Sequence, residues 1–284
     1  MDRPTFLAAL AGTTVARADP GATPPRAFDA QERRGRGRLG VAAIDLADGR
    51  RFGRRGGERF PLASTFKLLL VSDVLARVDR GAERLDRPVR YTAGDIIAYS
   101  PVAGAQPNGG SLSVAELCAA AIERSDNAAA NLLLRTVGGP AGLTAWLRRG
   151  GDRVTRLDRT EPALNDAPAG DLRDTTTPDA MAGHLARLVR DPVLSPGSKA
   201  RLFGWMRGAK TGTARIRAGV PAGWTVGDKT GTTNTAGNDV AILWPRSGAP
   251  IVLAVYLAEV RASDAERDAA IAAVAGEAIR RLRG

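Results

Sequence analysis

A serine and a lysine lie three residues apart at the start of an apolar segment. The pair is Ser64 and Lys67, and residues 66–78 carry apolar side chains at helical spacing. Positions i and i+3 share one face of a helix, so the Lys67 amine can reach the Ser64 hydroxyl. Serine becomes a nucleophile when a base lies within hydrogen-bond reach, and a helix N-terminus favours negative charge that develops there. The same tetrapeptide also fits a capping serine beside a surface lysine.

A second hydroxyl stands between two expected helices, in Ser125-Asp126-Asn127. The Ser125 hydroxyl is suited to relaying a proton, and the Asn127 amide to holding a substrate carbonyl. The alternative interpretation is a helix cap of the Asx type.

The sequence Lys-Thr-Gly occurs twice, at Lys229-Thr230-Gly231 and at Lys210-Thr211-Gly212. The first copy continues into Thr232 and lies among β-prone apolar residues, so we expect it on a strand, where glycine lets a ligand approach the backbone. The second copy has no flanking apolar run. We interpret it as a loop without a role in chemistry.

A carboxylate and an amide lie close together in a charged segment without periodicity, residues 153–174. Glu161 and Asn165 could together hold a water molecule there, although a solvated loop glutamate is the simpler alternative. Arg159 and Asp174 are placed to close the two ends of this loop.

The elements that must position these motifs follow from apolar patterning. Strands are expected at residues 39–45 and 51–54, and late in the chain at 224–227, 239–244 and 251–257. Helices are expected at 66–78, at 114–123 with a Ser113/Glu116 capping box, at 128–137, at 177–189 and at 264–282. The order predicts an α/β (α+β) fold in which both chain ends build one antiparallel sheet flanked by helices.

The predicted division follows the same order. Residues 27–60 and 210–284 form the α/β domain, and residues 61–209 form an all-helical inserted domain that carries Ser64, Ser125 and the Glu161 loop. A cleft between the two is the expected ligand site.

Composition limits the chemistry. One cysteine (Cys118) and one histidine (His184) among 284 residues exclude an intramolecular disulfide, a cysteine-based zinc site and any site that needs two imidazoles. Cys118 is expected in the core and His184 in packing; no metal or cofactor is expected. The net charge of +11 suggests nucleic acid, but the basic residues are dispersed and aromatics are only 5%, so we expect no such partner. Only four of the 41 basic residues are lysines: Lys67, Lys199, Lys210 and Lys229.

The first 18 residues contain a short apolar run and the sequence Ala16-Arg17-Ala18, which fits a signal-peptidase site. They are interpreted as a short or truncated secretion signal, with a disordered tail as the alternative. No stretch is long and apolar enough to span a membrane.

Along the chain the four motifs follow one another as S-x-x-K, S-D-N, E-P-x-L-N and K-T-G, and this order at these separations is very unlikely to arise by chance. S-x-x-K, S-D-N and K-T-G are the signature of class A β-lactamases and penicillin-binding proteins, and from about residue 27 onward the chain resembles a class A serine β-lactamase. The resemblance implies hydrolysis of penicillins and cephalosporins through a serine acyl-enzyme. It also implies antibiotic resistance, secretion or a periplasmic location, a monomer, and a small-molecule β-lactam as the only partner.

The resemblance also assigns roles to residues. Ser64 matches the acylated serine, Lys67 the residue that helps to activate it, Ser125 the proton donor to the lactam nitrogen, and Glu161 the carboxylate that activates the hydrolytic water. Whether Lys67 or Glu161 is the acylation base stays open. The matching substrate-binding residues are Tyr99, Asn127, Asn165, Arg215, Lys229, Thr230 and Thr232.

One departure from the common pattern concerns the substrate carboxylate. Many members have an arginine where this chain has Asn238, whereas Arg215 matches an alternative arginine position. An ordinary surface arginine is the other interpretation of Arg215. Ala63 and Thr233 stand where some carbapenem-hydrolysing members have cysteines, which lowers the expectation of carbapenemase activity.

Two related functions remain as alternatives. A penicillin-binding DD-peptidase shares three of the motifs but lacks the loop with Glu161 and Asn165. A β-lactam sensor stays acylated and needs no deacylating carboxylate, so Glu161 argues against it too.

Overall fold

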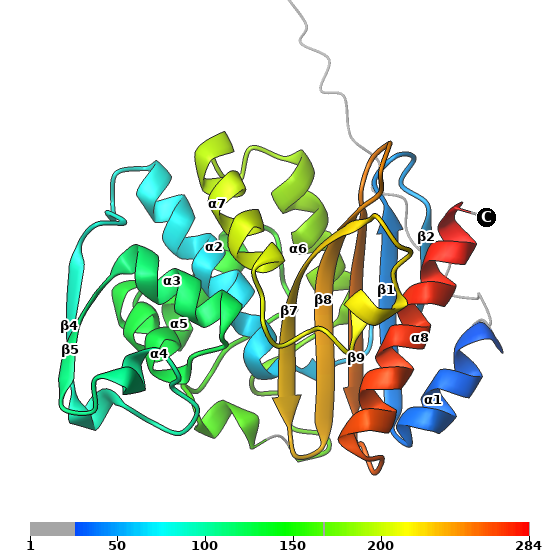
Figure 1. Ribbon diagram of the computed structural model, residues 1–284, viewed down its shortest axis with the longest axis horizontal. Helices are drawn as coiled ribbons and strands as arrows, with labels where there is room; N and C mark the ends of the chain where they lie inside the picture. The colour runs from blue at the N-terminus through cyan, green and yellow to red at the C-terminus, as the bar shows by residue number, and fades with distance from the viewer. Residues whose placement is uncertain (1–25, 167, 284) are drawn as a thin grey trace, which may run out of the picture.

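The computed structural model describes residues 26–166 and 168–283. The expected signal or tail at residues 1–18 lies outside the described residues. At the centre is a five-stranded antiparallel sheet with the strand order β2-β1-β9-β8-β7 (Figure 1). Its strands are β1 (Arg38–Asp45), β2 (Arg51–Arg54), β7 (Thr225–Thr233), β8 (Ala236–Trp244) and β9 (Ile251–Ala258).

The two ends of the chain meet in this sheet, as the sequence predicts. β1 pairs with β9 along its whole length, from Arg38 opposite Ala258 to Asp45 opposite Ile251. All residues of β9 are buried because both faces of the sheet are covered, which explains its unbroken apolar run. On one face, α8 (Asp264–Arg283) and α1 (Asp29–Gly35) pack together, while α6 (Pro178–Arg190) covers β1 and β9 on the other (Figure 1).

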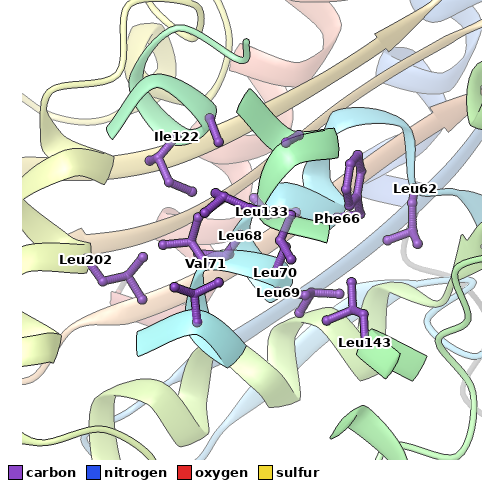
Figure 2. Close-up of a cluster of buried hydrophobic side chains, with 14 of the residues drawn as sticks. Leu62, Phe66, Leu68, Leu69, Leu70, Val71, Ile122, Leu133, Leu143 and Leu202 are labelled. Carbon is purple, nitrogen blue, oxygen red and sulfur yellow. The ribbon is translucent and has the colours of Figure 1, made fainter. Parts of the chain in front are cut away.

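The middle of the chain is mainly helical and is built around α2 (Phe66–Asp79). Most of α2 is buried, including the polar residues Lys67, Ser72 and Asp73, because other helices pack around it. Figure 2 shows Leu68 and Val71 of α2 among Ile122, Leu133 and Leu202, which come from surrounding helices. These helices are α3 (Val114–Glu123), α4 (Asn127–Thr136), α5 (Gly139–Arg149) and α7 (Pro196–Arg207).

The predicted capping box of α3 is confirmed. Ser113 Oγ accepts a hydrogen bond from the Glu116 amide at 3.3 Å, and the Glu116 carboxylate accepts one from the Ser113 amide at 2.7 Å. These bonds satisfy two groups that the helix leaves unpaired, and they fix where α3 begins.

Helices α5 and α7 are absent from the sequence prediction. Gly138-Gly139-Pro140 follows the helix expected at 128–137, and by its composition it marks the end of that helix. Gly138 does lie in the left-handed region (φ 90°), but Pro140 also opens α5, because proline suits the first turn of a helix. The middle segment further contains two short ladders, of β4 (Pro88–Thr92) with β5 (Gly109–Ser113) and of β3 (Phe60–Pro61) with β6 (Thr175–Thr176). The inserted part is therefore mainly helical rather than all helical, and its boundaries at 61 and 209 remain a prediction.

Candidate active site

Ser64 lies in a single helical turn, Ala63–Thr65, immediately before α2. The turn is pinned from inside the protein: Thr65 Oγ1 donates to the Leu62 carbonyl at 2.6 Å and lies 3.1 Å from the Tyr256 hydroxyl of β9. Ala63 and Thr65 are buried, whereas Ser64 is partly exposed. The fold thus presents the Ser64 hydroxyl at the N-terminal end of a buried helix. Ser64 itself lies in a 3₁₀ turn, and the α-helix begins at Phe66.

Lys67 is fully buried and its amine is surrounded by oxygen atoms. Nζ donates to Ser64 Oγ at 2.9 Å, to Asn127 Oδ1 at 2.6 Å and to the Ser125 carbonyl at 2.8 Å. It also lies 3.1 Å from Glu161 Oε1. Burial lowers the pKa of the Lys67 amine, and the Glu161 carboxylate opposes that shift. A lysine with a lowered pKa beside a serine hydroxyl can exchange a proton with it.

The Ser-Asp-Asn motif joins α3 to α4 through three different side-chain functions. Asp126 caps α4 by accepting from the Ala129 amide at 2.8 Å, so the helix-cap interpretation is correct for this residue. Its other oxygen accepts from the Val102 and Ala103 amides, at 2.8 and 3.0 Å. Asp126 thereby holds the loop at 99–103 against α4, which leaves its neighbours in the motif free to face Lys67.

The other two residues of the motif, Ser125 and Asn127, lie beside Lys67. The Asn127 side-chain amide donates to the Ala98 carbonyl at 2.9 Å, while its oxygen receives Lys67. Ser125 has a positive φ of 57° and is buried. Tyr99 also has a positive φ, 60°, and its ring is 61% exposed, consistent with the position at the entrance that the resemblance implies.

Strand β7 brings a second buried lysine to the Ser-Asp-Asn motif. Lys229 is fully buried, and its Nζ donates to Ser125 Oγ at 3.0 Å and to the Thr230 carbonyl at 2.7 Å. A Cβ at position 231 would lie 3.0 Å from the Leu62 carbonyl oxygen and 3.1 Å from the Ala63 Cβ. Glycine is therefore needed at Gly231 because β7 passes this close to the turn that carries Ser64.

The two lysines share one hydroxyl. Lys67 Nζ lies 3.4 Å from Ser125 Oγ, on the same atom that Lys229 contacts. Burial lowers the pKa of Lys229 well below its ordinary value, and the positive charge of Lys67 lowers it further. Two ammonium groups around one buried hydroxyl repel each other, so this arrangement favours the loss of a proton from one of them.

The Glu161 carboxylate enters the site from the loop between α5 and β6. Its Oε1 accepts from Ser64 Oγ at 3.3 Å, and its Oε2 accepts from the Asn165 amide at 2.6 Å. Asn165 Oδ1 is buried and has no partner within the described residues. The loop ends are joined as the sequence predicts: Arg159 Nε donates to Asp174 Oδ2 at 2.6 Å.

Arg215 is 4% exposed, so the surface-arginine interpretation is wrong. Its guanidinium forms an ion pair with Asp268 at 2.9 Å and donates to Thr232 Oγ1 at 2.9 Å. Two further bonds go to the carbonyls of Gly231 and Asn238, at 3.1 and 2.8 Å. Arg215 is thus held against β7 and β8 by these bonds, and its charge is paired with that of Asp268.

Two residues of this region, Asn131 and Thr211, were assigned no role from the sequence. Asn131 of α4 accepts from the Glu161 amide at 3.0 Å and donates to the Glu161 carbonyl at 2.9 Å. Thr211, from the Lys-Thr-Gly copy interpreted as an inert loop, lies 2.6 Å from the Thr230 hydroxyl. The copy is in a loop, as expected, and Lys210 is exposed, but Thr211 contacts a residue of the candidate site. The repeated motif was the one signal that could have identified it.

The single cysteine and the single histidine are both buried. Cys118 is buried, and burial raises the pKa of its thiol. His184 packs edge-on against Trp146, with ring centres 5.6 Å apart. Among the described residues no group of three or more acidic, histidine or cysteine side chains is arranged to hold a metal ion, and no helix there is long and apolar enough to cross a bilayer.

This chain is similar in sequence and fold to known β-lactamases. The profile of the β-lactamase enzyme family matches residues 26–282. An ancestral class A β-lactamase is 53% identical, with a TM-score of 0.88 over 91% of this chain and 100% of that chain. The class A enzyme of the last common ancestor of Gram-negative bacteria is 55% identical, with a TM-score of 0.88 over 90% of this chain and 98% of its own. A β-lactamase from Xanthomonas campestris pv. campestris is 47% identical, with a TM-score of 0.87 over 91% of this chain and 96% of its own.

The alternatives of a DD-peptidase and a β-lactam sensor are not favoured by these matches. On its sequence, fold and relatives together, the chain belongs to the β-lactamase enzyme family and is a class A enzyme that hydrolyses β-lactams.

Proposed function

We propose that this β-lactamase works through a covalent ester on Ser64, and that Glu161 directs the water that releases it. The observation that carries the proposal is the junction at Ser64 Oγ, which lies 2.9 Å from Lys67 Nζ and 3.3 Å from Glu161 Oε1. Two groups able to take a proton thus reach the same hydroxyl, which is what an activated serine requires.

In the acylation half, Ser64 Oγ attacks the lactam carbonyl carbon and gives up its proton to Lys67 or Glu161. Lys67 is the nearer of the two and has a lowered pKa, which favours it as the acceptor. The ring C–N bond then breaks, and the lactam nitrogen takes the proton of Ser125. Lys67 and Lys229 both contact Ser125 Oγ, so either amine can restore that proton.

In the deacylation half, a water molecule gives a proton to Glu161 and attacks the ester carbonyl carbon. Ser64 Oγ leaves and takes that proton from Glu161, which returns to its carboxylate form. The unpartnered Asn165 Oδ1 is an acceptor for the second hydrogen of that water, because Asn165 Nδ2 already holds the Glu161 carboxylate.

The same geometry supports assignments for substrate binding. Lys229, Thr230, Thr232 and Arg215 would bind the carboxylate that penicillins and cephalosporins carry, with Thr211 supporting Thr230. Asn127 and Tyr99 would contact the acylamido side. Two backbone N–H groups, those of Ser64 and Thr232, would stabilise the oxyanion.

The test is mass spectrometry of the enzyme after mixing with penicillin, with a parallel assay of a chromogenic cephalosporin. The unmodified enzyme should hydrolyse both with multiple turnovers. Glu161→Gln should accumulate a penicilloyl adduct on the peptide that contains Ser64, and Ser64→Ala should form no adduct. A Glu161→Gln enzyme that turns over at the parental rate would falsify the assigned deacylation step.

We further propose that the enzyme acts as a monomer outside the cytoplasm and protects its host from β-lactams. Family membership supports this, together with the apolar run in the first 18 residues. Expression of the chain with and without residues 1–18 in a susceptible bacterium tests it: only the longer form should appear in the periplasmic fraction and raise the inhibitory penicillin concentration.

A further inference from the structure

A second concave region lies on the outer side of α6, and its lining includes none of the residues assigned to the Ser64 site. This groove has a volume of about 910 Å³ and runs between α6 and the turn at residues 150–154. Volumes of 300–1,000 Å³ are usual for sites that bind small organic molecules. Its floor is made of small residues of α6, Ala180, Gly183 and Ala186, so a flat molecule can approach the helix closely.

Among the described residues, some of the charged side chains that line the groove have hydrogen-bond or ion-pair partners and others have none. Arg51 and Arg153 line it, and neither guanidinium has a hydrogen bond or ion pair among residues 26–166 and 168–283. Of the acids, Asp152 is occupied, because its Oδ1 accepts from the amides of Val154 and Thr155, at 2.8 and 2.9 Å.

Four more charged side chains complete the lining. Asp191 lies 3.6 Å from Arg187 in an exposed pair of the kind that contributes little, and Arg190 donates to the Leu46 carbonyl at 2.7 Å. Asp179 is the remaining acid. Burial raises the pKa of its carboxyl group, and the positive charge of Arg51 opposes that shift. Four arginines and three aspartates thus line the groove, which leaves its lining with a small excess of positive charge.

A buried polar atom points to the same region. His184 lines the groove and is 7% exposed, and its Nε2 is enclosed without a hydrogen-bond partner within the described chain. Burial lowers the pKa of His184 to about 4, so the ring is neutral at pH 7. Next to it, bounded also by Trp146 and Arg187, is an enclosed cavity of about 20 Å³, enough for one water molecule. Buried polar atoms are rarely left unpaired, so His184 is expected to gain a partner through this cavity.

We propose that the groove along α6 is a binding site for a small organic anion with a flat apolar body. The anionic group lies between the guanidiniums of Arg51 and Arg153, where charge-assisted hydrogen bonds are available to it. The apolar body covers Gly183 and its alanine neighbours, with His184 and its small cavity beside it.

The proposal is tested by titrating the enzyme with naphthoate, followed by amide NMR signals and by calorimetry. Naphthylmethanol and naphthylmethylammonium serve as neutral and cationic probes of the same shape. Naphthoate should shift the amide signals of Gly150 and Gly151 in the turn and bind at least about tenfold more tightly than the other two probes. The Gly231 amide reports on the Ser64 site, where a carboxylate could also bind.

Two kinds of variant separate the groove from other sites. A Cβ at Gly183 meets nothing within 4 Å, so a side chain at this position starts in open space, and Gly183→Phe is chosen to fill the groove. Gly204 of α7 is equally open and lines no part of the groove, so Gly204→Phe is the matched control. Naphthoate binding at Gly150 and Gly151 should be lost in Gly183→Phe, retained in Gly204→Phe and weakened about tenfold or more in the double variant Arg51→Gln/Arg153→Gln.

Cephalosporin hydrolysis at the parental rate shows that each variant is folded. The proposal is wrong if naphthoate shifts only the Gly231 signal, if Gly183→Phe binds it as tightly as Gly204→Phe, or if the cationic probe binds as tightly as the anion. None of these results bears on the Ser64 mechanism, because the groove and the catalytic residues are separate.

Discussion

At the scale of single residues, the candidate site contains a lysine whose burial favours the loss of its proton. Lys67 Nζ connects Ser64 Oγ with the Ser125 carbonyl and Asn127 Oδ1 in the buried interior, and burial lowers the pKa of its amine. Arginine stays protonated in proteins and has a planar guanidinium, so it can replace neither the chemistry nor the shape of Lys67. This explains a lysine at this position in a chain in which only four of 41 basic residues are lysines.

Lys67→Arg is therefore expected to lower kcat/KM for a cephalosporin by about 100-fold or more, the scale of a lost general base. Lys199→Arg is the control, since Lys199 is remote from the site and donates only to carbonyls at the end of α6. Stopped-flow measurement of acylation should show the loss in the first step. Equal kcat/KM values for the two variants would exclude Lys67 as a proton acceptor.

At the scale of elements, helix α4 fixes the position of the loop that carries Glu161. Asn131 of α4 forms two hydrogen bonds with the Glu161 backbone, at 3.0 and 2.9 Å. The loop is closed separately at its ends by Arg159 and Asp174. Glu161 is therefore held in the middle of its loop by a helix and not only by the loop itself.

Asn131→Ala removes both bonds and leaves the Glu161 amide without its acceptor. Deacylation should slow by about tenfold or more, since small misplacement of a catalytic group is costly. Acylation should change less, because Lys67 remains beside Ser64. Pre-steady-state kinetics should then show a burst of acylation followed by a slow steady state. Loss of acylation and deacylation in equal measure would argue that Asn131 acts on folding and not on Glu161.

At the scale of the whole molecule, one carboxyl group opposes the stability of the folded state at neutral pH. Asp73 of α2 is 2% exposed, and burial raises its pKa to about 6, against the weaker effects of Arg77, Arg80 and Arg149. Because the folded-state pKa is above the ordinary value of 3.8, the stability tied to protonated Asp73 is present at low pH. It is lost as the pH rises through about 6.

Asp73→Asn should therefore raise the free energy of unfolding by about 2 kcal/mol more at pH 8 than at pH 4. Urea denaturation at the two pH values measures this. Asp86→Asn is the control of opposite sign, because Arg84 lowers the pKa of the exposed Asp86 and its removal should give no gain at pH 8. A pH-independent effect of Asp73→Asn would mean that packing, not ionisation, sets the cost of Asp73.

Local patterns were sufficient for much of the fold. β2 spans residues 51–54 as predicted, and α3 begins at its Ser113 cap, because alternation and capping depend on near neighbours in sequence. The same logic failed at α5, where one Gly-Gly-Pro sequence both ends a helix and begins the next. The β4–β5 ladder was also missed, since its short strands are only partly buried and carry little apolar pattern.

The sequence by itself determined the motifs, their order and the family that they indicate, because residue types and spacings are properties of the chain. Only the tertiary structure decided which side chains meet. Arg215 reaches Thr232 and Asp268 across 17 and 53 residues, and Asn131 reaches Glu161 across 30. Thr211 was recognisable in sequence but became part of the site only through its contact with Thr230. Such contacts depend on how elements far apart in the chain, among them β7, α4 and α8, pack in three dimensions, which no local pattern encodes.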